Sequence, residues 1–173
     1  WDARWGRVME GAGEDPYYGA KVAAARVRGL QGDDLSADST ILACIKHFVG
    51  YGAAVAGKDY NSVDMSWGHF ANFYMPPYKA GVEAGAVTVM SAFNDFENRP
   101  CTGNEDLLRG LLKEKWGFQG FVVSDWGSVG EMVNHRYAKD QKEAANKAIT
   151  AGLDMEMVSE CYARNLADLV REK

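Results

Sequence analysis

The chain has 173 residues, 47% of them hydrophobic and 25% charged, which suits one globular domain and argues against an extended disordered chain. Its formal net charge of -5 argues against binding to nucleic acid or to an anionic membrane surface. No apolar run approaches the roughly 18 residues of a membrane span. The three cysteines form no C-x-x-C pair, so a disulfide framework, a zinc site or a redox site is not expected. Cys44 lies in an apolar run and is predicted to be buried.

Helical and strand patterns alternate along the chain. The first helix is predicted to start at Asp15-Pro16, because a capping carboxylate followed by proline is typical of a helix start, and to end at Gly32. Residues 66–83 also have helical spacing, but Pro76-Pro77 must break or restart that helix. The remaining predicted elements are helices after Asn104, around residues 145–149 and after a Ser159 cap, and strands at residues 41–48, 87–92, 121–125 and 153–157.

The alternation predicts an α/β fold with a parallel sheet and right-handed crossovers. The strand starts lie 46, 34 and 32 residues apart, and the last two spacings fit the roughly 31 residues per unit of a (β/α)8 barrel. We therefore expect part of a (β/α)8 TIM-like barrel with about four β/α units. Because half a barrel leaves two unpaired edges, the complete polypeptide is expected to continue at both ends. The competing architecture is an open doubly wound sheet, which no glycine-rich phosphate turn supports.

In such barrels the chemistry lies at the carboxyl ends of the strands. There this sequence has Lys46-His47, Met90-Ser91 and Ser124-Asp125-Trp126, followed in the fourth strand by Asp154 and Glu156. Polar groups at the ends of apolar strands need a partner or a substrate, because their burial alone is unfavourable. Asp154 and Glu156 are expected to shape the pocket or to cap a helix.

Asp125 is the strongest candidate, because it directly follows an apolar strand and precedes Trp126 and Gly127. One interpretation is a nucleophilic or general-base carboxylate. The other is a helix N-cap at a strand–helix junction, where aspartate is common. The residues alone do not decide between them.

The other candidate site residues also have both a functional and a structural interpretation. Lys46-His47 could bind sugar hydroxyls, Lys46 could form a Schiff base, or the pair could be structural. Arg7, close to Trp5 in the sequence, suits bidentate hydrogen bonding to hydroxyls or a carboxylate, or stacking on tryptophan. Trp126 could be an apolar plate for a sugar face or a core residue. No cluster of His, Asp or Glu has metal-ligand spacing, so neither a metal nor a cofactor is expected.

Several motifs follow one another along the chain: Trp5-Gly6-Arg7, Gly13-Glu14-Asp15-Pro16, Lys46-His47-Phe48 with Gly50-Tyr51-Gly52, Val89-Met90 and Ser124-Asp125-Trp126. Taken together and in this order, they resemble glycoside hydrolase family 3. Residues 57–66 and 74–81 are similar to its bacterial periplasmic β-glucosidase branch, and the resemblance covers essentially the whole chain. The most specific motifs are the Lys-His-Phe and Ser-Asp-Trp triplets.

The resemblance implies a retaining glycoside hydrolase that releases non-reducing terminal β-D-glucose from β-glucosides or oligosaccharides. Asp125 matches the nucleophile that forms the glycosyl-enzyme. Basic groups near it are expected to favour its charged form. The other matched positions bind the sugar: Arg7, Lys46 and His47 grip hydroxyls of the first subsite, Met90 lines that subsite and Trp126 is the aromatic at its edge.

The sequence departs from the family pattern at two positions. Phe93 stands where some members have a tyrosine, which affects one hydroxyl contact, and Asn98 replaces a turn glycine because asparagine tolerates positive φ. Lys58-Asp59-Tyr60 stands where the N-acetylglucosaminidase branch has Asp-Ser-His, which favours a glucosidase or a xylosidase.

The resemblance further implies that residues 1–173 are the central part of an N-terminal catalytic barrel domain. The acid/base is then expected in a second domain outside this chain, so the chain by itself is expected to be inactive. The expected partner is a β-glucoside or oligosaccharide substrate, and the expected location is periplasmic or secreted. A β-xylosidase of the same family, a Schiff-base lyase using Lys46 and a non-catalytic sugar-binding barrel are the alternatives.

Overall fold

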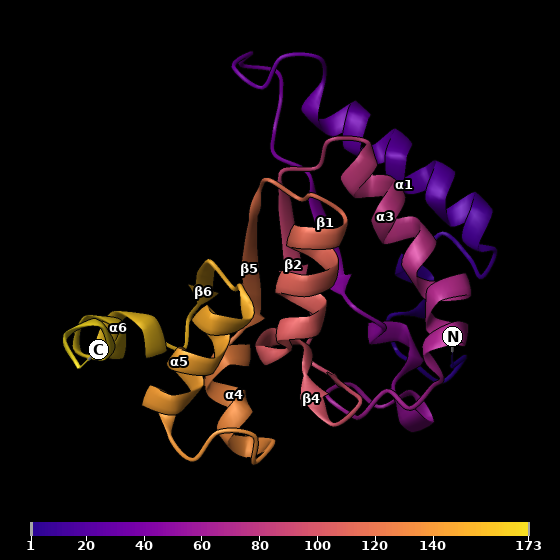
Figure 1. Ribbon diagram of the computed structural model, residues 1–173. Coiled ribbons are helices and arrows are strands. Elements are labelled where there is room, and N and C mark those ends of the chain that lie inside the picture. Colours follow the sequence, from indigo (N-terminus) through magenta and orange to yellow (C-terminus); the bar gives the residue numbers. More distant parts are fainter. Residues whose placement is uncertain (1, 173) are drawn as a thin grey trace.

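The computed structural model describes residues 2–172, which fold around a four-stranded parallel sheet (Figure 1). The predicted parallel neighbours are confirmed, although the first and last strands begin a few residues later than predicted. Ile41 and Leu42 precede the first strand and are 62% and 52% exposed. The strands, in their order across the sheet, are β1 (Cys44–Phe48), β2 (Thr88–Ser91), β5 (Phe121–Trp126) and β6 (Met155–Met157).

Helices connect the strands and flank the sheet at both of its edges (Figure 1). The connection from β1 to β2 contains α2 (Trp67–His69), a π-helical turn (Phe70–Tyr74) and α3 (Met75–Glu83). A two-stranded hairpin, β3 (Asp95–Phe96) and β4 (Arg99–Pro100), follows β2. The remaining helices are α1 (Pro16–Gln31) before the sheet, a π-helical segment (Asp106–Lys115) between β2 and β5, α4 (Ser128–Asn134) and α5 (Gln141–Ala151) between β5 and β6, and α6 (Cys161–Arg171). Single 3-10 turns occupy Val8–Glu10, Tyr51–Ala53, Val55–Gly57 and Cys101–Gly103.

The helix start at Asp15 is confirmed in detail. Its carboxylate accepts hydrogen bonds from the backbone N–H groups of Tyr17 and Tyr18 at 2.8 and 2.9 Å. These N–H groups have no partner within the helix, so the side chain satisfies them. Gly32 ends the helix with a φ of 57°, a conformation that glycine adopts without steric penalty.

The two prolines of the next helical segment restart a helix, as predicted. Pro76 and Pro77 occupy the first turn of α3, where the missing N–H groups would have no intrahelical partner in any case. The π-helical turn directly before them absorbs the change in hydrogen-bonding pattern.

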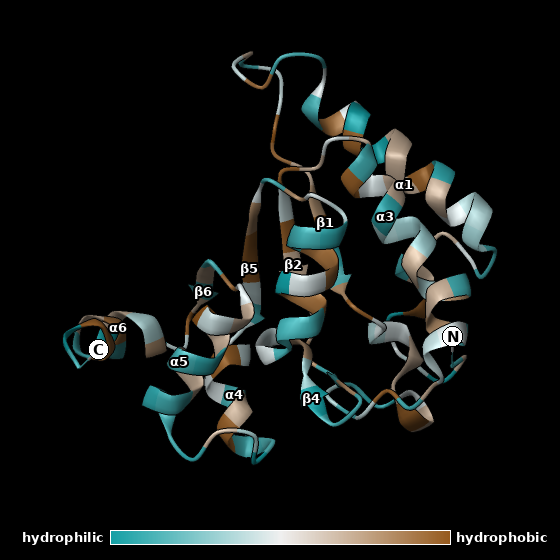
Figure 2. Cartoon of the chain, viewed as in Figure 1, coloured by the Kyte–Doolittle hydropathy of each residue, from teal (hydrophilic) through white to brown (hydrophobic). Residues whose placement is uncertain are grey.

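The core lies between the sheet and the helices that connect its strands. Val89 and Val122 of the central strands are fully buried, as are Leu108 and Leu112 of the π-helical segment and Ala148 of α5. Figure 2 shows β5 as largely hydrophobic, whereas the helices carry hydrophilic residues on their outer turns. This packing fixes the strands, and therefore the side chains at their carboxyl ends.

Three local predictions are wrong. Cys44 is exposed, because β1 is an edge strand of the described sheet and the next residue, Ile45, packs into the core instead. Ser159 does not cap α6: its hydroxyl donates to the Glu156 carboxylate at 3.0 Å, and Glu160 at positive φ precedes the helix. The helical spacing of Tyr162, Leu166, Leu169 and Val170 predicts that all four are buried, but Val170 is 75% exposed.

Candidate active site

Two strands of the sheet carry an extra residue at their carboxyl ends. In β1, Ile45 pairs with Val89 but Phe48 pairs with Ser91, so the Lys46-His47 pair contains one residue more than the facing strand. In β5, Val123 pairs with Met155 but Trp126 pairs with Met157, which puts the same irregularity at Ser124-Asp125. A β-bulge of this kind turns side chains out of the regular alternation. Both bulges lie where the sequence has its ionisable strand-end residues.

The Ser124 hydroxyl stabilises the bulge in β5. It accepts the backbone N–H of Met157 at 2.8 Å and donates to the carbonyl oxygen of Asp125 at 2.8 Å. The hydroxyl thus bonds to backbone groups that the irregular ladder leaves unpaired. From the sequence alone, Ser124 is only a neighbour of Asp125, because this role depends on strand register.

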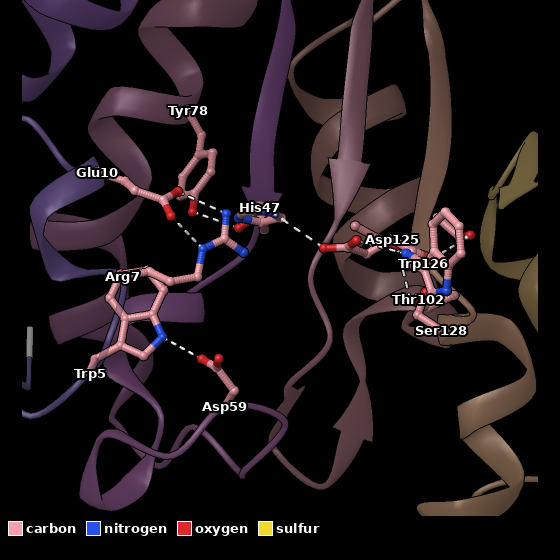
Figure 3. A network of polar contacts seen from close by, with 12 residues as sticks. Trp5, Arg7, Glu10, His47, Asp59, Tyr78, Thr102, Asp125, Trp126 and Ser128 are labelled. Carbon is pink, nitrogen blue, oxygen red and sulfur yellow. Dashed lines mark hydrogen bonds and ion pairs between the residues drawn. The ribbon is translucent and has the colours of Figure 1, made fainter. Parts of the chain in front are cut away.

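The bulges bring His47 and Asp125 together at one end of the sheet (Figure 3). The Nε2 atom of His47 lies 3.4 Å from Oδ2 of Asp125, and both residues are 8% exposed. The ring of Tyr51 contacts the imidazole edge-on at a centroid distance of 4.8 Å. The Tyr78 hydroxyl donates to the carbonyl oxygen of His47 at 2.7 Å. The imidazole is therefore held from several sides.

The two carboxylate oxygens of Asp125 have different surroundings. Oδ1 accepts the backbone N–H of Trp126 at 2.7 Å. Oδ2 is buried and accepts no hydrogen bond from any of residues 2–172. A buried carboxylate oxygen without a donor is unfavourable, and this distinguishes Asp125 from a helix cap: the helix that follows, α4, receives no side-chain cap from it.

The charge states of the pair follow from burial. Desolvation raises the pKa of Asp125, and the Trp126 N–H, Lys46 and Arg7 oppose this only in part. The expectation that the basic groups would favour the charged form is correct in direction, but burial outweighs them. For His47, burial and then the charges of Arg7 and Lys46 lower the pKa to about 4. The imidazole is therefore neutral at pH 7.

Arg7 points toward the same site but has a partner of its own (Figure 3). Its guanidinium forms a bidentate ion pair with Glu10, with distances of 2.7 and 2.8 Å, and lies 5.5 Å from the centroid of the Tyr51 ring. The ion pair raises the pKa of Arg7. Of the alternatives that the sequence leaves open for Arg7, bidentate pairing with a carboxylate occurs within the chain itself, and the ring beside the guanidinium is Tyr51 rather than a tryptophan.

The other predicted site residues lie around this centre. Lys46 is exposed on β1, and Met90 is half-buried on β2 in register with Val123, two residues before Asp125. Trp126 is 64% exposed at the end of β5. All predicted site residues therefore lie on the carboxyl-end side of the sheet or on the N-terminal segment that faces it.

Asp154 and Glu156 belong to the structure rather than to the site. The Asp154 carboxylate accepts the Val122 N–H at 2.8 Å and pairs with Lys113 at 2.7 Å. Glu156 accepts the Tyr162 N–H at 2.8 Å. Both carboxylates are occupied by the backbone and side chains that surround β6.

A family model described as glycosyl hydrolase family 3 N terminal domain matches residues 1–172. The chain belongs to glycoside hydrolase family 3. The N-terminal domain of this family is a TIM-barrel-like domain, so the four parallel strands are part of a barrel and the predicted fold class is confirmed. The doubly wound alternative is excluded.

The chain is similar to β-glucosidases and to β-xylosidases. It is 42% identical to a periplasmic β-glucosidase of Salmonella typhimurium over 98% of this chain and 22% of that protein. It is 40% identical to a β-xylosidase of Formosa agariphila over 91% of this chain and 22% of that protein. The structure of a β-glucosidase from Listeria innocua in complex with glucose superposes with a TM-score of 0.97 at 45% identity, over 99% of this chain and 24% of that one. The chain thus spans less than a quarter of the length of these relatives.

A hollow of about 360 Å³ lies next to the candidate site, between α1, β1 and α3. Lys46 and His47 line it, but Asp125 does not. Its remaining walls come from α1 and the loop before it, from β1 and the turn after it, and from the start of α3 with the π-helical turn that precedes it. We therefore place the candidate active site by the buried carboxylate and its neighbours, and not by this hollow.

Within residues 2–172, no group of three or more His, Cys, Asp or Glu side chains is placed to bind a metal ion. In the same part of the chain, no helix is long and apolar enough to cross a membrane.

Proposed function

We propose that this chain provides the nucleophile and part of the sugar subsite of a retaining glycoside hydrolase that releases non-reducing terminal β-D-glucose. The observation that carries the proposal is Asp125: a buried carboxylate at a strand end, with one oxygen bonded to the backbone and the other without a donor beside a neutral His47. Such an oxygen suits attack on an anomeric carbon.

In the first step, Asp125 attacks the anomeric carbon, the bond to the leaving group breaks, and a glycosyl ester forms. Hydrogen bonds to the sugar hydroxyls strengthen in the oxocarbenium-like transition state. Arg7, Lys46 and His47 supply the donors for these bonds. Met90 lines the subsite, and Trp126 provides an apolar surface at its rim. Water then hydrolyses the ester.

A second carboxyl group about 5–5.5 Å from the nucleophile must protonate the leaving group and then activate water. Asp154 and Glu156 are already bound by other groups. We propose that the acid/base comes from a second domain, and that residues 1–173 are the central part of the N-terminal catalytic barrel. The isolated chain should then hydrolyse aryl β-glucosides poorly or not at all. Turnover by the purified chain at a rate comparable to that of a complete enzyme would contradict this.

The similarity to β-glucosidases supports glucose as the released sugar, and the similarity to β-xylosidases makes xylose the second candidate. Membership of a glycoside hydrolase family argues against the Schiff-base lyase. The periplasmic relative supports a periplasmic or secreted location. Comparison of aryl β-glucoside with aryl β-xyloside turnover would decide between the two sugars.

The decisive experiment is covalent trapping. The complete enzyme is treated with a 2-deoxy-2-fluoro-β-glucoside that carries a good leaving group, and the labelled peptide is mapped. We expect the label on Asp125 and none on an Asp125→Asn variant. A stable adduct on another residue, or inversion of configuration in the product, would refute the proposal.

A further inference from the structure

The 3-10 turn Cys101–Gly103 contacts the elements that carry the candidate site, although none of its residues belongs to the site itself. All three residues of the turn are buried. Loops usually run over the surface of a protein, because their backbone and side-chain polar groups need hydrogen-bond partners. The partners of this enclosed turn therefore show which parts of the structure it holds in place.

On one side, the turn holds the residue that follows β1. The thiol of Cys101 donates to the carbonyl oxygen of Val49 at 3.6 Å, and the side-chain amide of Asn94 donates to the same oxygen at 3.1 Å. The Cys101 N–H in turn donates to the Asn94 carbonyl oxygen at 3.0 Å. Val49 is fully buried and lies two residues after His47. These bonds therefore fix the end of β1 next to the imidazole.

On the other side, three buried hydroxyl groups form a row that leads to the segment after the candidate nucleophile (Figure 3). The Thr102 hydroxyl lies 2.9 Å from that of Ser91, at the end of β2, and 2.9 Å from that of Ser128, in the first turn of α4. Ser91, Thr102 and Ser128 are 0%, 1% and 4% exposed. A hydroxyl donates one hydrogen bond and accepts two, so Thr102 can bond to both neighbours at the same time.

Ser128 is close enough along the chain to act on the nucleophile. It follows Asp125 by three residues, and the Trp126 N–H between them donates to Oδ1 of Asp125 at 2.7 Å. Gly127, with a φ of 72°, makes the turn from β5 into α4. The α4 helix receives no side-chain cap, so the buried hydroxyl row is what fixes the side chain of its first residue. A shift of Ser128 would therefore move the N–H that orients the carboxylate.

We propose that Thr102 is a positioning residue for the nucleophile: its hydroxyl holds Ser128 so that Asp125 keeps its orientation during attack. The proposal rests on the proposed function, because it takes Asp125 to be the nucleophile. Since the same turn also holds the end of β1, it sets the distance between the strands that carry His47 and Asp125, whose side chains lie 3.4 Å apart. A misplacement of about 1 Å in a reacting group can lower a rate about 10²-fold.

The pH dependence provides a measurement that a purely structural role would not change. The Trp126 N–H lowers the pKa of Asp125, so weakening of this hydrogen bond raises that pKa. The acid limb of kcat/KM, which reports ionisation of the nucleophile in the free enzyme, then moves to higher pH. The other titratable groups that interact with Asp125 are Arg7, Lys46, His47, Tyr60 and Glu131. Only Glu131 lies on α4 and would move with Ser128, so the shift is also measured in a Glu131→Gln background, where it should persist.

The test uses the complete enzyme and two substitutions that separate the hydroxyl of Thr102 from its methyl group. Thr102→Val keeps the shape of the side chain and removes the hydroxyl, whereas Thr102→Ser keeps the hydroxyl. We expect Thr102→Val to lower kcat/KM for an aryl β-glucoside, and the rate of inactivation by the 2-deoxy-2-fluoro-β-glucoside, about tenfold, and to move the acid limb to higher pH. Thr102→Ser should restore both rates to within about threefold and return the acid limb to its wild-type position.

Thr88→Val is the matched control. Thr88 is a threonine at the other end of β2, 6% exposed, and its hydroxyl donates to the Ala43 carbonyl oxygen at 2.9 Å. Because each valine variant loses one buried hydroxyl, both should have a lower Tm. Only Thr102→Val should change the kinetics, and Thr88→Val should leave kcat/KM within about twofold with the acid limb unchanged.

Ser128→Ala breaks the same hydroxyl row at its other end and should reproduce the kinetic effects of Thr102→Val. If Thr102→Val does not fold, Ser128→Ala decides by the same criteria. Equal kinetic changes for the two valine variants would overturn the proposal, as would an acid limb that stays in place or no recovery with Thr102→Ser. Failure of the proposed function is distinct, because the fluorinated glucoside would then not label the wild-type enzyme at Asp125.

Discussion

Replacement of Asp125 by asparagine separates a nucleophile from a structural cap, because the two roles predict opposite changes in stability. The Oδ1 atom of asparagine can still accept the hydrogen bond from the Trp126 N–H, whose length is 2.7 Å in the wild type. The substitution removes the negative charge of the carboxylate, whose buried Oδ2 atom has no hydrogen-bond donor. If that charge is present for chemistry, its removal abolishes turnover and stabilises the fold.

The expected change in stability follows from the burial of the Asp125 carboxylate. Burial raises the pKa of Asp125 above its usual 3.8, so its ionisation lowers stability as the pH rises from 3.8 through the folded-state pKa. A buried unsatisfied group costs about 1–3 kcal/mol. We therefore expect Asp125→Asn to raise the Tm of the barrel, by about 2–4 °C for each kcal/mol, while kcat for an aryl β-glucoside falls by orders of magnitude.

The assay is thermal unfolding at pH 7 together with kinetics, both on the complete enzyme. Asp140→Asn is the control, because Asp140 is an exposed N-cap whose carboxylate accepts the Glu143 N–H at 2.8 Å, and asparagine caps equally well. It should change neither Tm nor kcat. A decrease in Tm for Asp125→Asn, with substantial turnover retained, would show that Asp125 is structural.

Other substitutions test the sugar contacts and the packing of the loop that contains Gly57. In the complete enzyme, Arg7→Ala, Lys46→Ala and His47→Ala should each lower kcat/KM by about 10²-fold, since the hydroxyl contacts strengthen in the transition state; near-normal kinetics in a folded variant would make that residue structural. Gly57→Ala should destabilise by more than about 1 kcal/mol, because glycine there has positive φ and no space for Cβ. Gly6→Ala, where a Cβ would meet nothing within 4 Å, should have little effect, and equal Tm values for the two would refute the argument.

The sheet could be predicted from the sequence because it depends on local signals. Apolar runs at regular spacing indicate parallel strands, and the residue that ends each run must lie at the carboxyl edge. Asp15 and Gly32 mark the ends of α1 for equally local reasons. The short helix α4 was not predicted, because its seven residues carry too little periodicity for a pattern to emerge.

The contacts of the site could not be predicted in the same way. The bulges depend on strand register, which the sequence does not state, and the Tyr78 bond to His47 joins residues 31 positions apart. The Arg7–Glu10 pair had a local signal, since residues three apart are neighbours in a helical turn. The direction of the pKa shift of Asp125 cannot be predicted from the sequence, because burial, a property of the tertiary fold, outweighs the nearby cations.

The neutral state of His47 predicts how the fold responds to acid. Its pKa is 6.5 when unfolded and about 4 when folded, so between these values the unfolded chain binds a proton that the folded chain does not. Stability therefore decreases as the pH falls from 6.5 toward 4, by about 2 kcal/mol at pH 5. His47→Gln removes this loss, whereas His69→Gln, at an exposed position, leaves it. Asp125 titrates with the opposite sign, so the comparison uses the difference between the variants in unfolding free energy at pH 7 and pH 5. If both variants lose stability equally, the imidazole is not held neutral beside the nucleophile.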